Sequence, residues 1–217
     1  PDGLFKYRVD FDALDDTGPL AAVCVSRPTN PSGNVLDDDE VARLRAFART
    51  RGVPLIIDGA YGVPFPGIVF TRATPAWDED TILLLSLSKL GLPGVRTGIV
   101  VARPEIVRAL GAVTAVTSLA AGSVGPVLVR DALDRGELTR LAGDVIQPWY
   151  RERAAAALGW LRGALAGCEY RIHRPEGAFF LWLWLPRLTV TSAELYRRLK
   201  ARGVLVLSGH HFFPGLG

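Results

Sequence analysis

Short apolar runs in the first half of the sequence predict the strands of a sheet. These runs are rich in small, aliphatic and β-branched residues, and turn residues such as Gly and Pro bound them. They are Ala21–Ser26, Pro54–Ile57, Thr81–Leu85 and Thr97–Ala102. After the first run, acidic residues followed by an apolar stripe at helical spacing predict a helix over Asp37–Arg51.

The order of these elements predicts a mixed, mostly parallel sheet. A strand, a helix and a second strand form a crossover unit, so the first two strands should run parallel. Asp58 follows the second strand and therefore should lie at the carboxyl edge of the sheet, where open α/β sheets bind ligands. The segment between the last two strands is too short for a helical crossover, so that pair should be antiparallel.

The second half of the sequence is mostly helical and then changes character. Its helical patterns cover Glu105–Val116, Val124–Asp134 and Glu137–Ala166. Pro148 should break or kink the last of these helices, because proline lacks the backbone N–H. Beyond Gly167 the pattern predicts strands at Tyr170–His173, Ala178–Leu185 and Val204–Leu207 and a helix at Ser192–Arg202.

These patterns together predict an α/β protein in two parts. We expect a large-domain portion over residues 1–146 and a smaller α+β domain over residues 147–217. The all-apolar strand at residues 178–185 should bury both of its faces, including Trp182 and Trp184.

Composition argues against several classes of protein. No apolar run approaches the ~20 residues that span a membrane, so we expect no membrane partner. The net charge is +3 without a basic block that contains aromatic residues, so we expect no nucleic-acid partner. Cys24 and Cys168 lack metal or redox spacing, which favours a reducing, cytoplasmic compartment.

The sequence contains no methionine, not even at position 1, and it ends without a closing helix or strand. We therefore expect a segment of a longer protein, without its N-terminal part and its C-terminal end.

Lysine is rare in this sequence, and one lysine follows a predicted strand. The 25 basic residues include only three lysines, Lys6, Lys89 and Lys200. A lysine in apolar surroundings can lose its proton, so Lys89 is a candidate nucleophile or base. The strand-end position alone is equally compatible with an amine that reaches solvent.

Five further polar residues follow predicted strands. They are Asn30 in NPSG, Asp58 and Tyr61 in DGAY, Ser86 in SLSK, and Arg96. Each has an ordinary explanation, since Asn is common in turns and Asp often caps a helix. In this order at one edge of a sheet, they predict a single site together with Lys89.

The motifs N-P-x-G, D-x-A-Y, S-x-S-K and G-x-P-G-x-R-x-G occur here in order. In this respect the whole chain resembles the pyridoxal-phosphate-dependent aminotransferases of fold type I, class I/II. The stretches SRPTNPSGNVL, SLSKLGLPG and GHHFFPGL resemble the branch that exchanges amino groups between valine and pyruvate. The resemblance implies pyridoxal 5′-phosphate as cofactor, an aliphatic amino acid and a 2-oxo acid as substrates, and a homodimer in the full-length protein.

The resemblance also implies a role for each residue of the predicted site. Lys89 would bond to the cofactor aldehyde and then move the substrate proton. Asp58 would pair with the pyridine nitrogen and keep it protonated, which makes the ring an electron sink. Tyr61 and Asn30 would donate hydrogen bonds to the 3′-oxygen of the cofactor.

Ser86 and Arg96 would hold the phosphate of the cofactor. Family members also carry an N-terminal phosphate loop and a C-terminal arginine that binds the substrate carboxylate. No motif of this sequence matches either part, so we expect the chain alone to be weakly active or inactive.

Other functions stay open on the sequence alone. The same fold and cofactor serve other aminotransferases and β-lyases, and aminotransferase-like domains also act as non-catalytic sensors in transcriptional regulators. We expect no metal centre at His210 and His211, because adjacent residues of a strand point to opposite faces.

Overall fold

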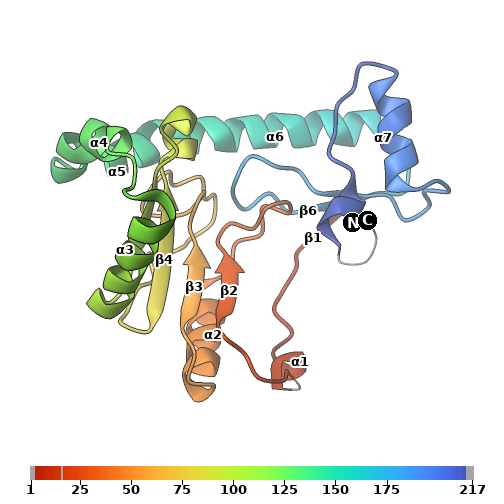
Figure 1. Ribbon diagram of the computed structural model, residues 1–217. Helices are drawn as coiled ribbons and strands as arrows, with labels where there is room; N and C mark the ends of the chain where they lie inside the picture. Colours follow the sequence, from red (N-terminus) through yellow and green to blue (C-terminus); the bar gives the residue numbers. More distant parts are fainter. Residues whose placement is uncertain (1–2, 16, 214–217) are drawn as a thin grey trace.

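The structure is a computed structural model that describes residues 3–15 and 17–213 (Figure 1). Its larger sheet has the order β2-β3-β4-β5 and contains β2 (Val23–Ser26), β3 (Leu55–Asp58), β4 (Thr81–Ser86) and β5 (Gly98–Val101). The first three strands run parallel and β5 is antiparallel to β4. The predicted mixed α/β sheet is confirmed.

Helix α2 (Asp38–Thr50) connects β2 to β3 and supplies one side of the core. It begins with a capping box, because the Asp37 carboxylate accepts the Glu40 backbone N–H at 2.8 Å and the Glu40 carboxylate accepts the Asp37 N–H at 3.0 Å. The apolar stripe predicted from the sequence is buried, and its side chains Val41, Leu44 and Ala48 join the same cluster as Leu55 and Leu83.

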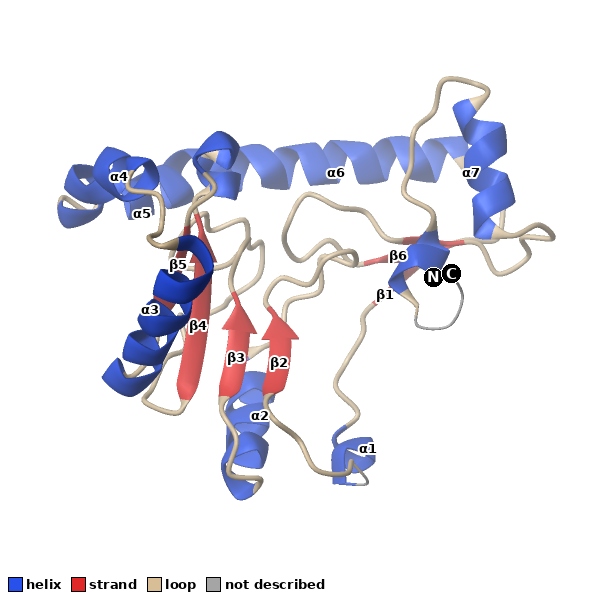
Figure 2. Ribbon diagram, in the orientation of Figure 1, coloured by secondary structure: helices blue, strands red, loops and turns tan. Residues whose placement is uncertain are grey.

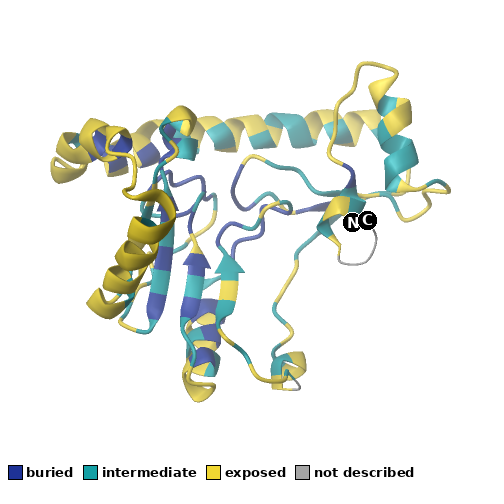
Figure 3. Ribbon diagram, viewed as in Figure 1, coloured by how far each residue is buried: buried dark blue, intermediate teal, exposed yellow. Residues whose placement is uncertain are grey.

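Four helical segments follow the large sheet. They are α3 (Pro104–Ser118), α4 (Val124–Asp134), α5 (Glu137–Leu141) and α6 (Gln147–Ala164). The short helix α1 (Phe11–Asp15) precedes β2. Helix α6 runs past both sheets and links the two parts of the molecule (Figures 1 and 2). Helix α3 has no buried residue, and almost its whole length is exposed (Figure 3).

Of the two outcomes predicted at Pro148, a break is wrong, and the helix is distorted there instead. The chain stays helical from Glu137 to Ala164, and one π-helical turn, η3 (Ala142–Ile146), precedes the proline. Proline cannot donate to the carbonyl four residues earlier and its ring crowds that carbonyl. A wider turn at this point accommodates both effects without ending the helix.

A second, smaller sheet has the order β1-β6-β7 and contains β1 (Leu4–Phe5), β6 (Arg171–His173) and β7 (Leu183–Trp184). Strand β1, which the sequence pattern does not predict, runs parallel to β6, and β7 runs antiparallel to it. Helix α7 (Ser192–Lys200) follows, and the 3₁₀ helix η4 (Gly209–Phe212) closes the described chain. The start of the chain therefore joins the sheet of residues 147–217.

Two strand predictions in this part need correction. Only Leu183–Trp184 of the predicted strand 178–185 is a strand, and Ala178 has a positive φ of 56°, which ends extended pairing. Trp184 is 56% exposed, so the expected burial of both faces is also wrong. Residues 204–207 form no strand, because they find no partner strand in the described chain and lie exposed.

Candidate active site

The ends of three parallel strands meet at one edge of the large sheet. In the register of the strands, Ser26 of β2 pairs with Asp58 of β3, and Asp58 pairs with Leu84 of β4. Strand β4 continues to Ser86, which pairs with Gly98 of β5. The loops that carry the predicted site residues therefore leave the sheet at the same edge.

Asp58 presents an exposed carboxylate that its neighbours hold in place. Its Oδ1 accepts the Ala60 backbone N–H at 2.9 Å, and its Oδ2 accepts the Ser26 hydroxyl at 3.4 Å. The backbone after Asp58 is tightly packed, since a Cβ on Gly59 would lie 2.9 Å from the Leu84 carbonyl oxygen. The glycine of the D-G-A-Y motif is thus needed for the close approach of β3 and β4.

Tyr61 and Lys89 lie close together. Lys89 belongs to the short 3₁₀ helix η1 (Ser88–Leu90), and its Nζ lies 5.4 Å from the centroid of the Tyr61 ring and 5.6 Å from that of Phe179. Burial raises the pKa of the Tyr61 phenol, and the negative charge of Asp58 raises it further. Tyr61 is therefore a protonated hydrogen-bond donor at neutral pH.

An aromatic cluster surrounds Tyr61, and sequence reasoning missed it. Phe179 and Phe180 meet the Tyr61 ring edge-on at 5.2 and 5.4 Å, and Tyr150 stacks on Phe179 at 5.4 Å. The sequence assigned both phenylalanines to a buried strand. The sequence signal that the two phenylalanines lie outside a strand is the preceding Gly177. A side chain at this position would collide with Pro28 and with the Ile68 carbonyl, so the backbone passes both at close range.

Serine and arginine side chains lie at the end of β4 and on the segments that follow it. The Ser86 hydroxyl accepts the Ser88 backbone N–H at 3.2 Å. Arg96 follows the 3₁₀ helix η2 (Pro93–Val95) with a positive φ of 48°, and its exposed guanidinium donates to the Ser88 hydroxyl at 3.5 Å and to the Pro93 carbonyl at 3.4 Å. These contacts are long, so the guanidinium retains donors for an anion.

Asn30 lies exposed in the loop that follows β2. Two backbone hydrogen bonds of 2.8 Å close this loop, from Thr29 N–H to the Asn34 carbonyl and from Gly33 N–H to the Thr29 carbonyl. The loop starts beside Asp58, because the Arg27 N–H donates to the Asp58 carbonyl at 2.9 Å.

The set of groups at this edge fits pyridoxal phosphate. A carboxylate suits the protonated ring nitrogen, a protonated phenol suits the ring oxygen, and hydroxyls with a guanidinium suit the phosphate. The amine of Lys89 supplies the nucleophile that the aldehyde requires. The structure thus places Tyr61 near both Lys89 and Asp58, and the segments that carry Asn30, Ser86 and Arg96 leave the same edge.

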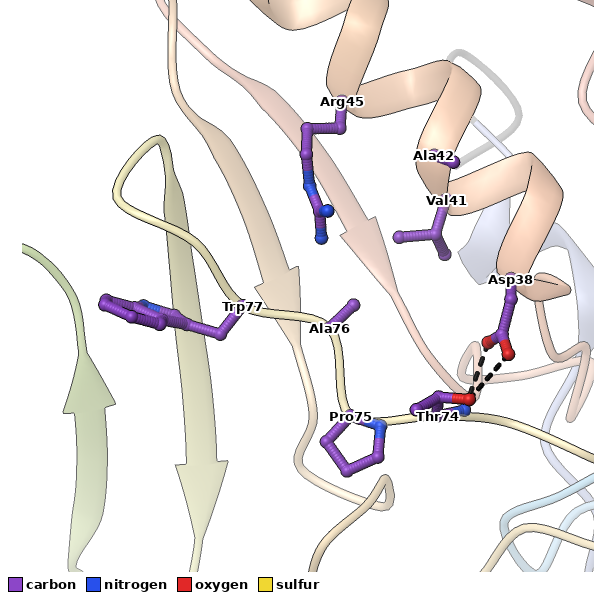
Figure 4. Close-up of a pocket in the computed structure, with 8 residues that line it drawn as sticks. All are labelled: Asp38, Val41, Ala42, Arg45, Thr74, Pro75, Ala76 and Trp77. Atoms are coloured by element: carbon purple, nitrogen blue, oxygen red, sulfur yellow. Dashed lines mark hydrogen bonds between the residues drawn. The ribbon is translucent and has the colours of Figure 1, made fainter.

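A hollow between α2 and the segment 74–77 is separate from this set (Figure 4). Its lining residues are Asp38, Val41, Ala42, Arg45, Thr74, Pro75, Ala76 and Trp77. The Asp38 carboxylate accepts the Thr74 hydroxyl and backbone N–H at 2.6 and 3.0 Å, as drawn in the figure. None of the predicted site residues lines it, and its Arg45 guanidinium forms an ion pair with Asp78 at 3.1 Å.

The histidine pair of GHHFFPG lies in the 3₁₀ helix η4, and the strand expected there is wrong. His210 Nδ1 lies 2.8 Å from the Ser208 hydroxyl and 3.0 Å from that of Ser192, so this side chain joins η4 to the start of α7. In the described part of the chain, His, Cys, Asp and Glu side chains form no group of three that could hold a metal ion.

Comparisons with known proteins agree with this geometry. The model of the family "Aminotransferase class I and II" matches residues 5–213. The chain is 49% identical to the valine–pyruvate aminotransferase of Escherichia coli over 216 residues, which cover 100% of this chain and 52% of that protein. It is 29% identical to the 2-aminoadipate transaminase of Thermus thermophilus, with coverage of 96% and 54%.

Solved structures give the same result. A putative amino-acid aminotransferase from Psychrobacter arcticum has a TM-score of 0.95 at 46% identity, with 98% of this chain and 50% of that chain covered. The valine–pyruvate aminotransferase of Salmonella typhimurium has a TM-score of 0.93 at 48% identity, with 99% and 55% covered. The chain spans about half the length of the curated relatives it matches. It belongs to the class I and II aminotransferase family, with the fold of these enzymes.

Proposed function

We propose that the whole protein that carries this chain is a pyridoxal-phosphate-dependent aminotransferase that moves the amino group of valine to pyruvate and so forms alanine. The observation that carries the proposal is the placement of the Lys89 amine beside Tyr61, with the Asp58 carboxylate on the neighbouring strand end. The choice of valine and pyruvate rests on the 49% identity to the Escherichia coli enzyme.

The chemistry divides between the cofactor and the residues of this chain. Pyridoxal phosphate, when bound, supplies an electron sink for the negative charge that develops at the substrate Cα. Asp58 would bind the protonated ring nitrogen, and the bonds from Ser26 and Ala60 hold its carboxylate in position. Lys89 Nζ would remove the proton from the Cα of the donor amino acid and, in the second half of the exchange, would protonate the Cα of the product amino acid.

The other residues orient the ring and its phosphate. Tyr61 would donate a hydrogen bond to the 3′-oxygen of the cofactor, because the raised pKa of the phenol keeps its proton in place at neutral pH. The side-chain amide of Asn30 would donate a second hydrogen bond to the same 3′-oxygen. Ser86 and Arg96 hold the phosphate, and the left-handed backbone at Arg96 turns that residue out of the short helix before it.

We further infer that the whole protein is a homodimer that acts in the cytoplasm. The apolar helix α3, which has no buried residue, supports an interface, and the two free, exposed cysteines support a reducing compartment. Among the described residues, no helix is long and apolar enough to pass through a membrane.

Covalent trapping on the whole protein tests the proposal. Borohydride treatment of the protein with pyridoxal phosphate should fix the cofactor on the peptide that contains Lys89, as seen by mass spectrometry. Lys89→Ala should lose this label and all exchange of valine with pyruvate. Lys200→Ala, which removes an exposed lysine of α7, should keep both.

The substrates are tested by the two half-reactions. Valine should convert the bound cofactor to its amino form, and pyruvate should restore the aldehyde form. Release of ammonia from β-substituted amino acids with no use of valine would assign a β-lyase instead. Absence of any label in the wild-type protein would overturn the proposal.

A further inference from the structure

The loop that carries Asn30 is tied to both parts of the molecule. At its start, the buried Arg27 guanidinium donates to the Leu36 and Thr74 carbonyls at 2.7 and 2.9 Å and to the Asp38 carboxylate at 2.6 Å. These bonds fix the start of the loop to Leu36 near its other end, to the segment before β4 and to the start of α2. A second set of buried polar contacts fixes its other end to the smaller sheet.

The second set is centred on a buried ion pair. Lys6 follows β1, Glu176 follows β6, and their side chains are 13% and 4% exposed. Lys6 Nζ donates to the Glu176 carboxylate, to Asn34 Oδ1 at 3.2 Å and to the Val35 carbonyl at 2.8 Å. All three ammonium donors are therefore used, two of them on the loop.

The Glu176 carboxylate contacts the loop directly as well. It accepts the Val35 backbone N–H at 3.2 Å. A Cβ on Gly33 would lie 2.7 Å from the Gly177 carbonyl oxygen, so the two backbones touch with no side chain between them. Gly33 also has a positive φ of 71°, a conformation that suits glycine.

His173 completes the contact between β6 and the loop. Its Nε2 lies 3.2 Å from Asn34 Oδ1, and the ring stacks on Tyr7 at 5.5 Å. The bond from Lys6 identifies this atom of Asn34 as the amide oxygen, which can only accept, so Nε2 of His173 must carry the proton and donate. The imidazole is fully buried, with no described partner at Nδ1.

We propose, on the basis of the function proposed above, that Lys6 and Glu176 are positioning residues of the cofactor site. Their ion pair holds Asn34 and Val35, and the Asn34 carbonyl in turn accepts the Thr29 N–H that closes the loop around Asn30. Neither residue touches the site. They act by fixing the Asn30 loop relative to the smaller sheet.

An ion pair suits this task better than an apolar contact. Buried charges are costly to desolvate, and apolar replacements of similar volume often stabilise a protein equally well. Directional bonds to Asn34 and to both backbone groups of Val35 instead specify one position of the loop. The expected consequence of their loss is a misplaced loop in a folded protein.

The test compares three forms of the whole protein with wild type. Glu176→Gln breaks the ion pair, and the double variant Lys6→Met/Glu176→Leu replaces it by apolar groups without leaving a buried unpaired charge. Glu105→Gln is the control, because Glu105 forms an exposed ion pair with Arg108 on α3. Hydrogen exchange without cofactor, cofactor affinity and the pH titration of the bound-cofactor absorbance are measured.

In both variants of the pair, the Thr29 and Gly33 amides should exchange about tenfold faster or more, while the amides of β3 keep their rates. Pyridoxal phosphate should bind about tenfold more weakly, and its absorbance titration should shift in pH. Glu105→Gln should match wild type in all three measurements.

Wild-type exchange rates at Thr29 and Gly33 in a folded double variant would overturn the positioning role. So would faster exchange with an unchanged cofactor affinity and an unchanged titration. A wild-type protein that binds no pyridoxal phosphate would instead overturn the proposed function, and the exchange rates measured without cofactor separate the two results.

Discussion

Tyr61 illustrates how surroundings set the property of a single side chain. Its ring is packed by Phe179 and Phe180, and burial together with the Asp58 carboxylate raises the pKa of its phenol. The ring contributes to packing and the hydroxyl to the proposed site, so the two contributions can be separated by mutation.

Tyr61→Phe should keep the aromatic cluster and lose the donor. A hydrogen bond to a charged group contributes about 1.5–3 kcal/mol, so kcat should fall roughly 10- to 100-fold with little change in stability. Steady-state kinetics and thermal unfolding of the whole protein check this. Tyr196→Phe on α7 is the control, and an equal loss of activity in both variants would contradict the role of Tyr61.

His173 adds a dependence of stability on pH. Burial lowers its pKa below the ordinary value of 6.5, against the opposing effect of Glu176, while the positive charges of Lys6 and Arg174 lower it further. Because the folded pKa is depressed, this contribution to stability is complete above pH 6.5 and is lost as the pH falls toward the folded pKa.

The unfolding free energy of the wild-type protein should therefore decrease below pH 6.5, with a contribution from His173 of at most about 1.4 kcal/mol per pH unit. His173→Gln keeps a donor for Asn34 but does not titrate, so it should remove this part of the slope. Denaturant unfolding at several pH values measures it. His211→Gln, at an exposed position, should retain the wild-type slope.

The sequence motifs predicted residues of the site that lie close to a strand end. Asp58 and Ser86 are the last residues of β3 and β4, and Lys89 lies three residues beyond β4, so strand order alone places them at one edge. Lys6 and Glu176 are 170 positions apart, and no local pattern links them. Such a contact depends on how the two sheets meet, which the sequence pattern does not specify.

At the scale of elements, helices were predicted well where their ends carry local signals. Helix α2 begins one residue after Asp37 because the Asp37 and Glu40 side chains satisfy backbone N–H groups that the helix leaves free. Helix α4 has the predicted limits, Val124–Asp134. No side chain caps the start of α4, and the local signal at its end is Gly136, which has a positive φ of 69°.

Asp37→Ala should destabilise the protein by about 1 kcal/mol, because the cap bond to the Glu40 N–H is lost. Asp39→Ala removes a charge from the same helical turn without removing a cap, and it should cost less. Chemical denaturation of both variants measures the difference. Equal losses would show that charge, and not the cap bond, stabilises this end of α2.

Strands were predicted less well, because a strand depends on a partner. Residues 204–207 have an apolar, β-branched pattern, yet Leu205 and Leu207 are 74% and 75% exposed and no described strand pairs with them. Strand β1 shows the reverse, since two residues become a strand because β6 lies beside them. Pattern alone cannot supply these partners.

At the scale of the molecule, the exposed apolar surface of α3 and α4 is the feature that the fold leaves without a partner. Its large side chains are exposed by 42% or more; they are Val107, Leu110, Val113, Val116, Val124, Val127, Leu128 and Leu133. The exposed length of α3 is visible in Figure 3. Exposed apolar surfaces of this kind mark interfaces in soluble proteins.

A second copy of the whole protein is the occupant we infer, and replacing two central valines tests it. Val113→Asp/Val116→Asp places two charges on each side of a self-complementary interface, where burial of an unpaired charge is costly and the burial of each valine, about 1.5–3 kcal/mol, is lost. The dissociation constant of the dimer should rise at least about 100-fold.

Sedimentation velocity over a range of concentrations measures this change. Ala164→Asp, at an exposed position near the far end of α6, is the control and should remain as dimeric as wild type (Figure 1). A dimer that persists in the double variant, together with a loss of unfolding free energy, would place α3 against the rest of the same polypeptide. The two outcomes differ because an interface between copies dissociates on dilution, whereas an interface within one chain does not.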